Sequence, residues 1–273
     1  MKKKIINNIK IKPLPTDEIK DSRPCKGWKI FLDDLYPNLS MIAKKKSGKT
    51  VALGNIVKLC CDDRTIVIVF SPNIYSDNSH IGLRDHCEKK GIEYHGYTSI
   101  IDENGNNIIK ILENQLREQA KQRMIDSKII NKMSIKDLQD YMFENDDGED
   151  KEKKKKYKVP EYCVIIDDLR SEIKSSVVRS MIQMNRHYHI MCIISSQYSK
   201  DLMPASRENI DSCIVFKKQP DKRIQQLCDD LDLEKPIDDL IEIYKDATKE
   251  DYSFLFIDIR NEKYRKKLDT EYC

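Results

Sequence analysis

Apolar residues along this chain gather in short runs that are separated by longer segments of mixed character. The runs have the length of β-strands, are rich in Ile and Val, and several are apolar without interruption. A strand that is buried on both faces reads in this way. We therefore expect strands at 39–42, 65–70, 93–97, 163–166, 189–195, 211–216 and 253–257.

Between these runs, apolar residues recur at three- and four-residue spacing, which is typical of an amphipathic helix. Helices are expected at 51–61, 80–90, 108–125, 134–143, 173–184 and 221–231. Strands that alternate with helices, several of them continuously apolar, favour an α/β fold around a mostly parallel sheet. We predict this fold, with helices on the faces of the sheet.

Two polar regions interrupt the pattern. Residues 1–27 contain three prolines and are expected to form an extended N-terminal arm. Residues 28–273 are expected to form a single domain, with a helical and charged insertion at about 104–158. Within the insertion, an acidic run followed by lysines at 144–156 has the composition of a solvated surface loop.

Composition excludes some classes of protein but does not identify the function. The net charge of +3 is too small to indicate a nucleic-acid binder unless basic residues cluster locally. No apolar run approaches the roughly 20 residues of a membrane-spanning helix, and no secretory segment follows the basic N-terminus. The nine cysteines form no C-x-x-C pair, and three lie inside strand-like runs. We expect a cytoplasmic protein without membrane contact, in which cysteines act as small hydrophobic residues.

The segment 43–50 has the spacing of a phosphate-binding loop, with alanine at the first glycine position. In such a loop, backbone N–H groups surround a phosphate, and the following helix adds positive potential from its dipole. Lys49 would reach the β- and γ-phosphates of ATP, and the Thr50 hydroxyl would bind Mg²⁺. The alternative is a lysine-rich surface turn. The predicted nucleotide-binding residues are Ala43, Lys44, Lys45, Lys46, Ser47, Gly48, Lys49 and Thr50.

Two carboxylates follow the apolar strand expected at 163–166. A parallel strand delivers its C-terminal residues to the sheet edge where ligands of open α/β sheets bind. Asp167 is therefore the predicted magnesium residue, and Asp168 is predicted to orient or deprotonate the attacking water. Gln197, after the next strand, could sense the γ-phosphate or the water if its strand lies between the other two. The alternatives are an acidic strand end and a solvated glutamine.

The order of these motifs is more specific than any one of them. They are accompanied by Val-Phe-Ser-Pro at 69–72, Asn-Arg-His-Tyr at 185–188, Ser-Ser-Gln-Tyr at 195–198, and Leu-Met-Pro-Ala-Ser-Arg-Glu-Asn-Ile-Asp at 202–211 before Val-Phe-Lys at 215–217. Together they resemble the genome-packaging ATPases of large DNA viruses and virophages. These form the poxvirus-type branch of the FtsK–HerA superfamily of P-loop NTPases. The resemblance covers roughly residues 38–217 and is weak at 100–158.

The resemblance implies a RecA-like core, ATP hydrolysis, and a homo-oligomeric ring, pentameric or hexameric, that moves double-stranded DNA into a preformed capsid. Contact with DNA would be nonspecific, and capsid vertex proteins would be further partners. The resemblance also implies a location in the host cell's virus factory or on the virion. It also implies an arginine that reaches a neighbouring subunit's nucleotide. Arg207 matches the family's Arg-x-Asn pattern and is the first candidate, and Arg186 is the second. The alternative for Arg207 is a surface ion pair with Glu208 or Asp211.

Other functions remain compatible with the residues. The phosphate loop and the acidic pair would equally serve another DNA-translocating or helicase-like P-loop ATPase. The family's loop usually contains more glycine than 43–50 does. This difference puts the affinity for nucleotide in doubt more than the fold. A capsid-associated DNA-binding protein that does not hydrolyse ATP is therefore the non-enzymatic alternative.

Overall fold

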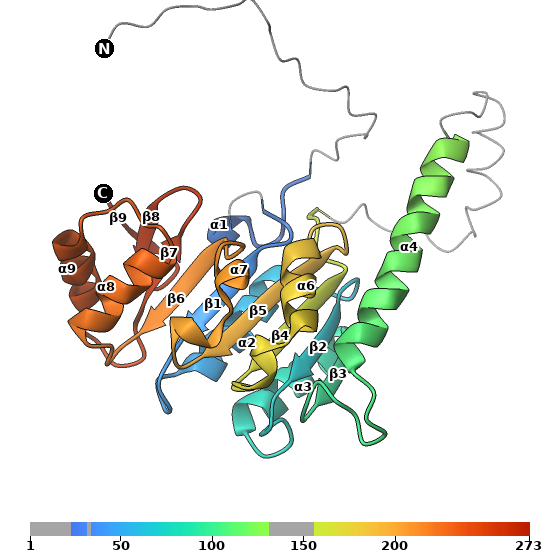
Figure 1. Ribbon diagram of the computed structural model, residues 1–273, viewed down its shortest axis with the longest axis horizontal. Helices are drawn as coiled ribbons and strands as arrows, with labels where there is room; N and C mark the ends of the chain where they lie inside the picture. Colours follow the sequence, from blue (N-terminus) through green and yellow to red (C-terminus); the bar gives the residue numbers. More distant parts are fainter. Residues whose placement is uncertain (1–22, 32–33, 131–155) are drawn as a thin grey trace, which may run out of the picture.

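The computed structural model describes residues 23–31, 34–130 and 156–273. Within them, nine strands form one sheet that has helices on both faces (Figure 1). The strands are β1 (Asn38–Ile42), β2 (Ile66–Phe70), β3 (Glu93–Tyr97), β4 (Tyr162–Asp167), β5 (Ile190–Ser196), β6 (Ser212–Phe216), β7 (Phe254–Asp258), β8 (Lys263–Lys266) and β9 (Thr270–Tyr272). Their order in space is β3-β2-β4-β5-β1-β6-β7-β8-β9.

The first six of these neighbours, from β3 to β6, pair in parallel. The last three strands continue the sheet in antiparallel pairing. The predicted α/β fold with a mostly parallel sheet is thus confirmed. The neighbours of β4 matter for the site described below. On one side β5 separates β4 from β1, and on the other side β4 pairs with β2.

The helices are α1 (Trp28–Phe31), α2 (Lys49–Cys60), α3 (Asn78–Lys90), α4 (Ile108–Ile130), α6 (Ser176–Met184), α7 (Pro204–Arg207), α8 (Asp221–Asp230) and α9 (Ile237–Ala247). Two 3₁₀ turns, η1 (Glu172–Lys174) and η2 (Ser199–Asp201), follow β4 and β5. None of the helices in the described residues combines the length and apolarity that crossing a bilayer requires.

Each face of the sheet carries its own hydrophobic core, because successive residues of a strand point to opposite faces. On one face, Leu39 and Met41 of β1 pack in a cluster with Leu53 and Ile56 of α2 and Leu83 of α3. This layer holds α2, the helix that follows the phosphate loop, against the sheet.

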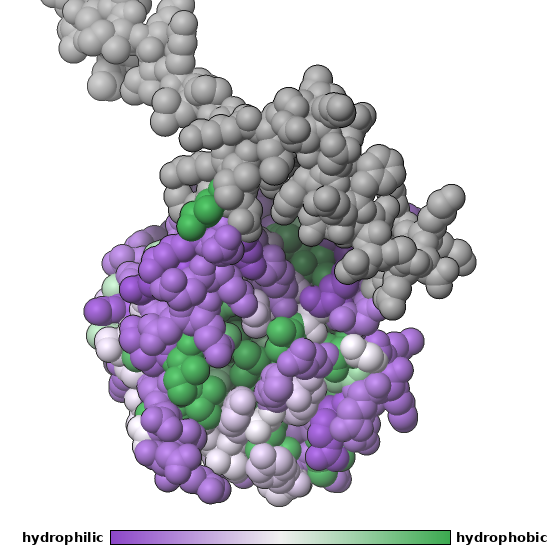
Figure 2. All heavy atoms as spheres, turned by 90° about the vertical axis from the view of Figure 1, so that its right-hand side faces the viewer, coloured by the Kyte–Doolittle hydropathy of each residue, from purple (hydrophilic) through white to green (hydrophobic). Residues whose placement is uncertain are grey.

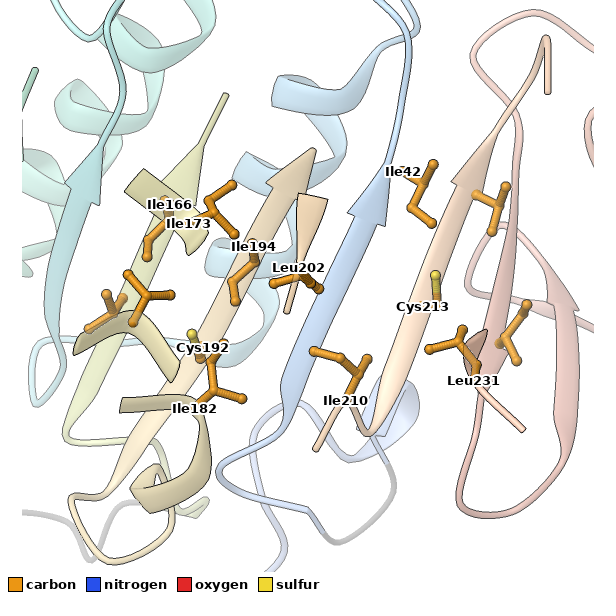
Figure 3. Packing of buried hydrophobic residues seen from close by; sticks show 14 of the residues in the cluster. Ile42, Ile166, Ile173, Ile182, Cys192, Ile194, Leu202, Ile210, Cys213 and Leu231 are labelled. Atoms are coloured by element: carbon orange, nitrogen blue, oxygen red, sulfur yellow. The ribbon is translucent and has the colours of Figure 1, made fainter. Parts of the chain in front are cut away.

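The second core covers the opposite face. Figure 3 shows Ile166 of β4, Ile194 of β5 and Ile42 of β1 on the same side of the sheet as Ile182 of α6. Side chains of α4, α8 and α9 complete this cluster. Because the central strands are buried on both faces, their carboxyl ends are fixed relative to one another.

Cysteines contribute to both cores. All nine are free, and eight are buried. Burial raises the pKa of Cys192 and of Cys213 to about 12, so these thiols stay protonated. The interpretation of the strand cysteines as small hydrophobic residues is confirmed.

Helix α4 packs through Ile109, Leu112 and Leu116, which are buried against the second core. Ile111 and Ile125 of the same helix are exposed. Figure 2 shows the side of the molecule that carries α4 and β3, where hydrophobic residues lie among a mostly hydrophilic surface. The helix therefore buries one stripe and extends further than the predicted 108–125.

Other expectations need correction or lie outside the described residues. The helix expected at 173–184 is divided, because Ser175 has an extended ψ of 150° and its hydroxyl caps α6 by accepting from the Val178 N–H. Strands β8 and β9 and helix α9 were not predicted. The helix expected at 134–143, the charged run up to 155 and residues 1–22 of the arm lie outside the described residues. At the end of that arm, Cys25 is buried and pairs with Lys158.

Candidate active site

The predicted phosphate loop connects β1 to α2. Ala43 is buried, and its N–H donates to the carbonyl of Ser196 at the end of β5 (3.0 Å). The chain then turns through two left-handed residues, Lys46 (φ 61°) and Gly48 (φ 90°), before α2 begins at Lys49. The first N–H groups of a helix have no acceptor within it, so the start of α2 offers donors to an anion.

Two observations favour glycine at position 48. An L-residue rarely adopts its φ of 90°, and a Cβ at this position would lie 3.1 Å from Cδ1 of Tyr252. The other loop residues differ in exposure. The side chains of Lys44, Lys45 and Lys46 are exposed, whereas the Ser47 hydroxyl is buried and has no partner among the described residues. Any contact of these three lysines with phosphate would therefore come from their backbone N–H groups more readily than from their side chains.

Asp167 ends β4 and is almost completely buried. One carboxylate oxygen forms an ion pair with Lys49 Nζ at 2.8 Å, and the other lies 3.1 Å from His80 Nε2. Burial alone would raise the pKa of Asp167, but the hydrogen bond from His80 and the charge of Lys49 outweigh it and lower the pKa to about 2. Asp167 is therefore ionised at neutral pH, as a magnesium ligand must be.

Asp168 follows at the point where the strand ends. Its φ of 60° turns the chain sharply, and its N–H donates to the carbonyl of Ser195 at 3.3 Å. Unlike Asp167 it is only half-buried. A half-buried carboxylate at the mouth of the site can reach a water molecule, whereas Asp167 is held by its two partners.

The loop and both carboxylates line one cleft of about 350 Å³. Its remaining wall comes from the segment between β2 and α3. The position of this wall follows from topology, because Phe70 of β2 is the register partner of Ile166 of β4. Sequence reasoning missed these residues: Ser71, Asn73, Asp77, Ser79 and His80.

The turn after β2 contained a signal that could have identified this wall. The strand expected at 65–70 ends at Ser71-Pro72-Asn73, and parallel strands present their carboxyl ends at one sheet edge. Asp77 then caps α3, since its carboxylate accepts from the Ser79 N–H at 2.8 Å. This cap sets the start of the helix that carries His80, the residue which holds Asp167.

Gln197 follows β5, which does lie between β1 and β4. It is half-buried and lines a neighbouring cavity of about 250 Å³ rather than the cleft that holds Lys49 and Asp167. That cavity is basic, with Arg170, Lys174 and Arg223 among its lining residues. The structure therefore places Gln197 beside the cleft, and its role as a sensor stays a prediction.

Arg186 lies between α6 and β5, and Arg207 ends α7 in the connection from β5 to β6. Neither is among the residues that line the cleft of Lys49 and Asp167. Arg207 is mostly buried and forms an ion pair with Asp230 at 2.6 Å. Arg186 is about half exposed and forms an ion pair with Asp211 at 3.0 Å. An arginine that acts on a neighbouring subunit must lie away from its own nucleotide, so this placement leaves both as candidates.

The chain is thus an α/β protein with a mostly parallel sheet, and its cleft brings the start of a helix together with two carboxylates at a strand end. Among solved structures, it is similar to the genome packaging NTPase B204 from Sulfolobus turreted icosahedral virus 2 in complex with AMP. The identity is 15%, the match covers 85% of this chain and 96% of that chain, and the TM-score is 0.50. The expected resemblance to genome-packaging ATPases is confirmed as a likeness of fold.

Two further solved structures align less closely. B204, the DNA-packaging ATPase from Sulfolobus Turreted Icosahedral Virus, is 16% identical over 84% of this chain and 95% of that chain, with a TM-score of 0.47. ATPases 2 and 3 of EssC from Geobacillus thermodenitrificans are 15% identical over 70% of this chain and 34% of that chain, with a TM-score of 0.46. No protein-family model and no curated protein sequence matches the chain.

Proposed function

We propose that this chain is a Mg²⁺-dependent ATPase with a RecA-like core, and that it moves double-stranded DNA into a viral capsid. The contact between Lys49 and Asp167 carries the proposal. These residues belong to two motifs that are far apart in the sequence, and they meet at 2.8 Å in one cleft. A lysine-rich surface turn and an unrelated acidic strand end would have no reason to meet in this way.

The cleft residues fit ATP and Mg²⁺. Lys49 would move from Asp167 to the β- and γ-phosphates, and the buried Ser47 hydroxyl and the free N–H groups at the start of α2 supply further donors. The ionised Asp167 and the hydroxyl of Thr50, which also lines the cleft, would hold the ion. Bound there, Mg²⁺ would neutralise charge that develops on the phosphate oxygens.

Hydrolysis requires a group that orients water and accepts its proton. Asp168 is the best placed carboxylate, because it lines the cleft and forms none of the contacts that hold Asp167. As the water oxygen bonds to the γ-phosphorus, the bond from phosphorus to the β,γ-bridging oxygen breaks, and Asp168 takes up the proton of the water. The products are ADP and inorganic phosphate.

The DNA-packaging part of the proposal rests on more general support. The fold is similar to that of a genome packaging NTPase, and β5 lies between β1 and β4, as a RecA-like core requires. In a homo-oligomeric ring, pentameric or hexameric, Arg207 or Arg186 would complete the site of the neighbouring subunit. The ring would grip DNA phosphates without reading sequence, dock on capsid vertex proteins, and work in the virus factory or on the virion.

The test is ATP turnover by the purified chain, with and without blunt duplex DNA. Wild type should hydrolyse ATP, and duplex DNA should stimulate it. Lys49→Ala should lower turnover by on the order of a hundredfold or more, because the variant lacks the ammonium group that would stabilise the negative charge of the γ-phosphate in the transition state. Lys58→Ala is the control, since Lys58 is exposed on the same helix.

Each result separates one alternative. Near-normal turnover by Lys49→Ala would remove the basis of the ATPase proposal. Turnover that responds only to forked DNA would favour a helicase-like enzyme. ATP and DNA binding by wild type without any turnover would favour a capsid-associated DNA-binding protein.

A further inference from the structure

A second cleft adjoins the phosphate loop, and Asp167 is not among the residues that line it. It has a volume of about 520 Å³, within the range of small-molecule sites. Gly48 and Val51 line both clefts, so the two are continuous at the start of α2. Its walls come from two distant parts of the chain: Gly48, Val51, Ala52 and Asn55 on one side, and Tyr252, Phe254, Lys267, Leu268 and Asp269 on the other.

The two clefts differ in chemistry. The first presents lysines, hydroxyls and carboxylates, which suit phosphates and a metal ion. The second is lined mainly by apolar and aromatic side chains, with Asn55, Lys267 and Asp269 as polar groups. Val51 is 59% exposed and Tyr252 is 71% exposed, although large apolar side chains are usually withdrawn from water. Exposed apolar residues that gather at one cleft indicate a ligand.

Tyr252 is held beside the phosphate loop by its backbone. It lies between α9 and β7 with a φ of 61°, a conformation that costs a non-glycine residue about 1–3 kcal/mol. Its ring approaches Gly48 so closely that a Cβ there would lie 3.1 Å from Cδ1. The strained turn therefore places an exposed aromatic ring next to the loop that would hold the phosphates.

We propose that this second cleft binds the base of the nucleotide, with the ring of Tyr252 stacked on it. The inference rests on the proposed function, because it assigns the part of ATP that the phosphate loop does not hold. A nucleobase is planar and aromatic, with polar groups only at its edge. Val51, Ala52 and Tyr252 match its faces, and Asn55 and Asp269 can hydrogen-bond to its edge. The antiparallel strands after β6 are thereby part of the nucleotide site.

Two ligands separate the base from the phosphates. ATP carries both, whereas inorganic tripolyphosphate carries only the phosphates. We expect wild type to bind ATP more tightly than tripolyphosphate in calorimetric titrations with Mg²⁺. Tyr252→Ala should weaken ATP binding by about tenfold to a hundredfold, which is the usual effect of losing one stacked base, and should leave tripolyphosphate binding unchanged. Tyr252→Phe should bind ATP as wild type does, because it keeps the ring.

Leu59→Ala provides the matched control. Leu59 is exposed on α2, as Val51 is, but it lies two turns further along and outside the cleft that the described residues form. This variant should bind both ligands normally. A direct readout is photolabelling with 8-azido-ATP, which should modify peptides that contain Tyr252 or residues 267–269.

The outcomes distinguish this inference from the proposed function. If wild type binds ATP and tripolyphosphate equally, or if Tyr252→Ala weakens both equally, the phosphate site stands and the base site is wrong. If photolabel appears only on residues 71–80, the base lies in the first cleft instead, and the inference is again wrong. If wild type binds neither ligand, the proposed function itself fails.

Discussion

Replacing Gly48 with alanine would disturb the phosphate loop in two ways at once. The φ of 90° is a left-handed conformation, which costs a residue with a Cβ roughly 1–2 kcal/mol. The new Cβ would also lie 3.1 Å from Cδ1 of Tyr252. Because that tyrosine is exposed, its ring can move aside, so the backbone conformation dominates. We expect Gly48→Ala to lower the free energy of unfolding by about 1–2 kcal/mol.

Gly54 supplies a control on the same helix. It lies inside α2, and apart from the adjacent backbone of that helix a Cβ built there meets no heavy atom of the described residues within 4 Å. Alanine is favoured over glycine inside a helix by about 0.5–1 kcal/mol. Gly54→Ala should therefore raise the free energy of unfolding, so the two glycine variants should shift it in opposite directions.

Urea unfolding followed by circular dichroism measures both variants. Adding Tyr252→Ala to Gly48→Ala should relieve only the contact, and most of the loss should persist. Full recovery in that double variant would show that the ring, and not the φ of Gly48, causes the loss. If Gly48→Ala is as stable as wild type, residue 48 does not adopt the left-handed conformation.

Three further predictions address the chemistry. Asp168→Asn should bind ATP normally but lose most turnover in a steady-state assay, since an amide accepts no proton; normal turnover would exclude Asp168 as the base. The lowered pKa of Asp167 contributes about 2 kcal/mol of stability above its unfolded pKa, near 3.8, and this is lost as pH falls to about 2. The free energy of unfolding, measured between these pH values, should fall with pH in wild type and stay constant in Asp167→Asn. An equal dependence of this free energy on pH in the two proteins would contradict the ion pair. Arg207→Ala and Lys49→Ala subunits, each inactive alone, should regain activity when mixed if Arg207 acts in trans, whereas mixed rings without activity would turn attention to Arg186.

The central sheet could be predicted because its strands are buried on both faces. A strand such as 163–166 needs apolar residues at every position, and few other structures produce so short and continuous a run. The phosphate loop and the acidic pair could be located for a related reason. Each follows one of these strands directly, and the carboxyl ends of parallel strands share an edge.

The remaining parts depend on contacts that a local pattern does not encode. In β8 only Tyr264 and Arg265 are buried, and the strand exists because β7 is beside it. His80 became part of the site through the order of the sheet, which places β2 against β4. Nothing in the spacing of residues 66–80 specifies that neighbour. Tyr252 likewise reaches Gly48 only because the last strands extend the sheet beyond β6.

The position of β5 has a mechanical consequence. At its carboxyl end, the carbonyl of Ser196 accepts from the Ala43 N–H, and the carbonyl of Ser195 accepts from the Asp168 N–H. One strand end is thus bonded to the base of the phosphate loop on one side and to the acidic pair on the other.

The chain that leaves this strand end continues directly into the basic cavity. After Gln197, two guanidinium groups contact the ring of Tyr198, with Arg170 at 4.6 Å and Arg223 at 4.2 Å from its centroid. Residues 195–198 therefore connect both sides of the phosphate cleft to the basic cavity through the backbone of one strand end.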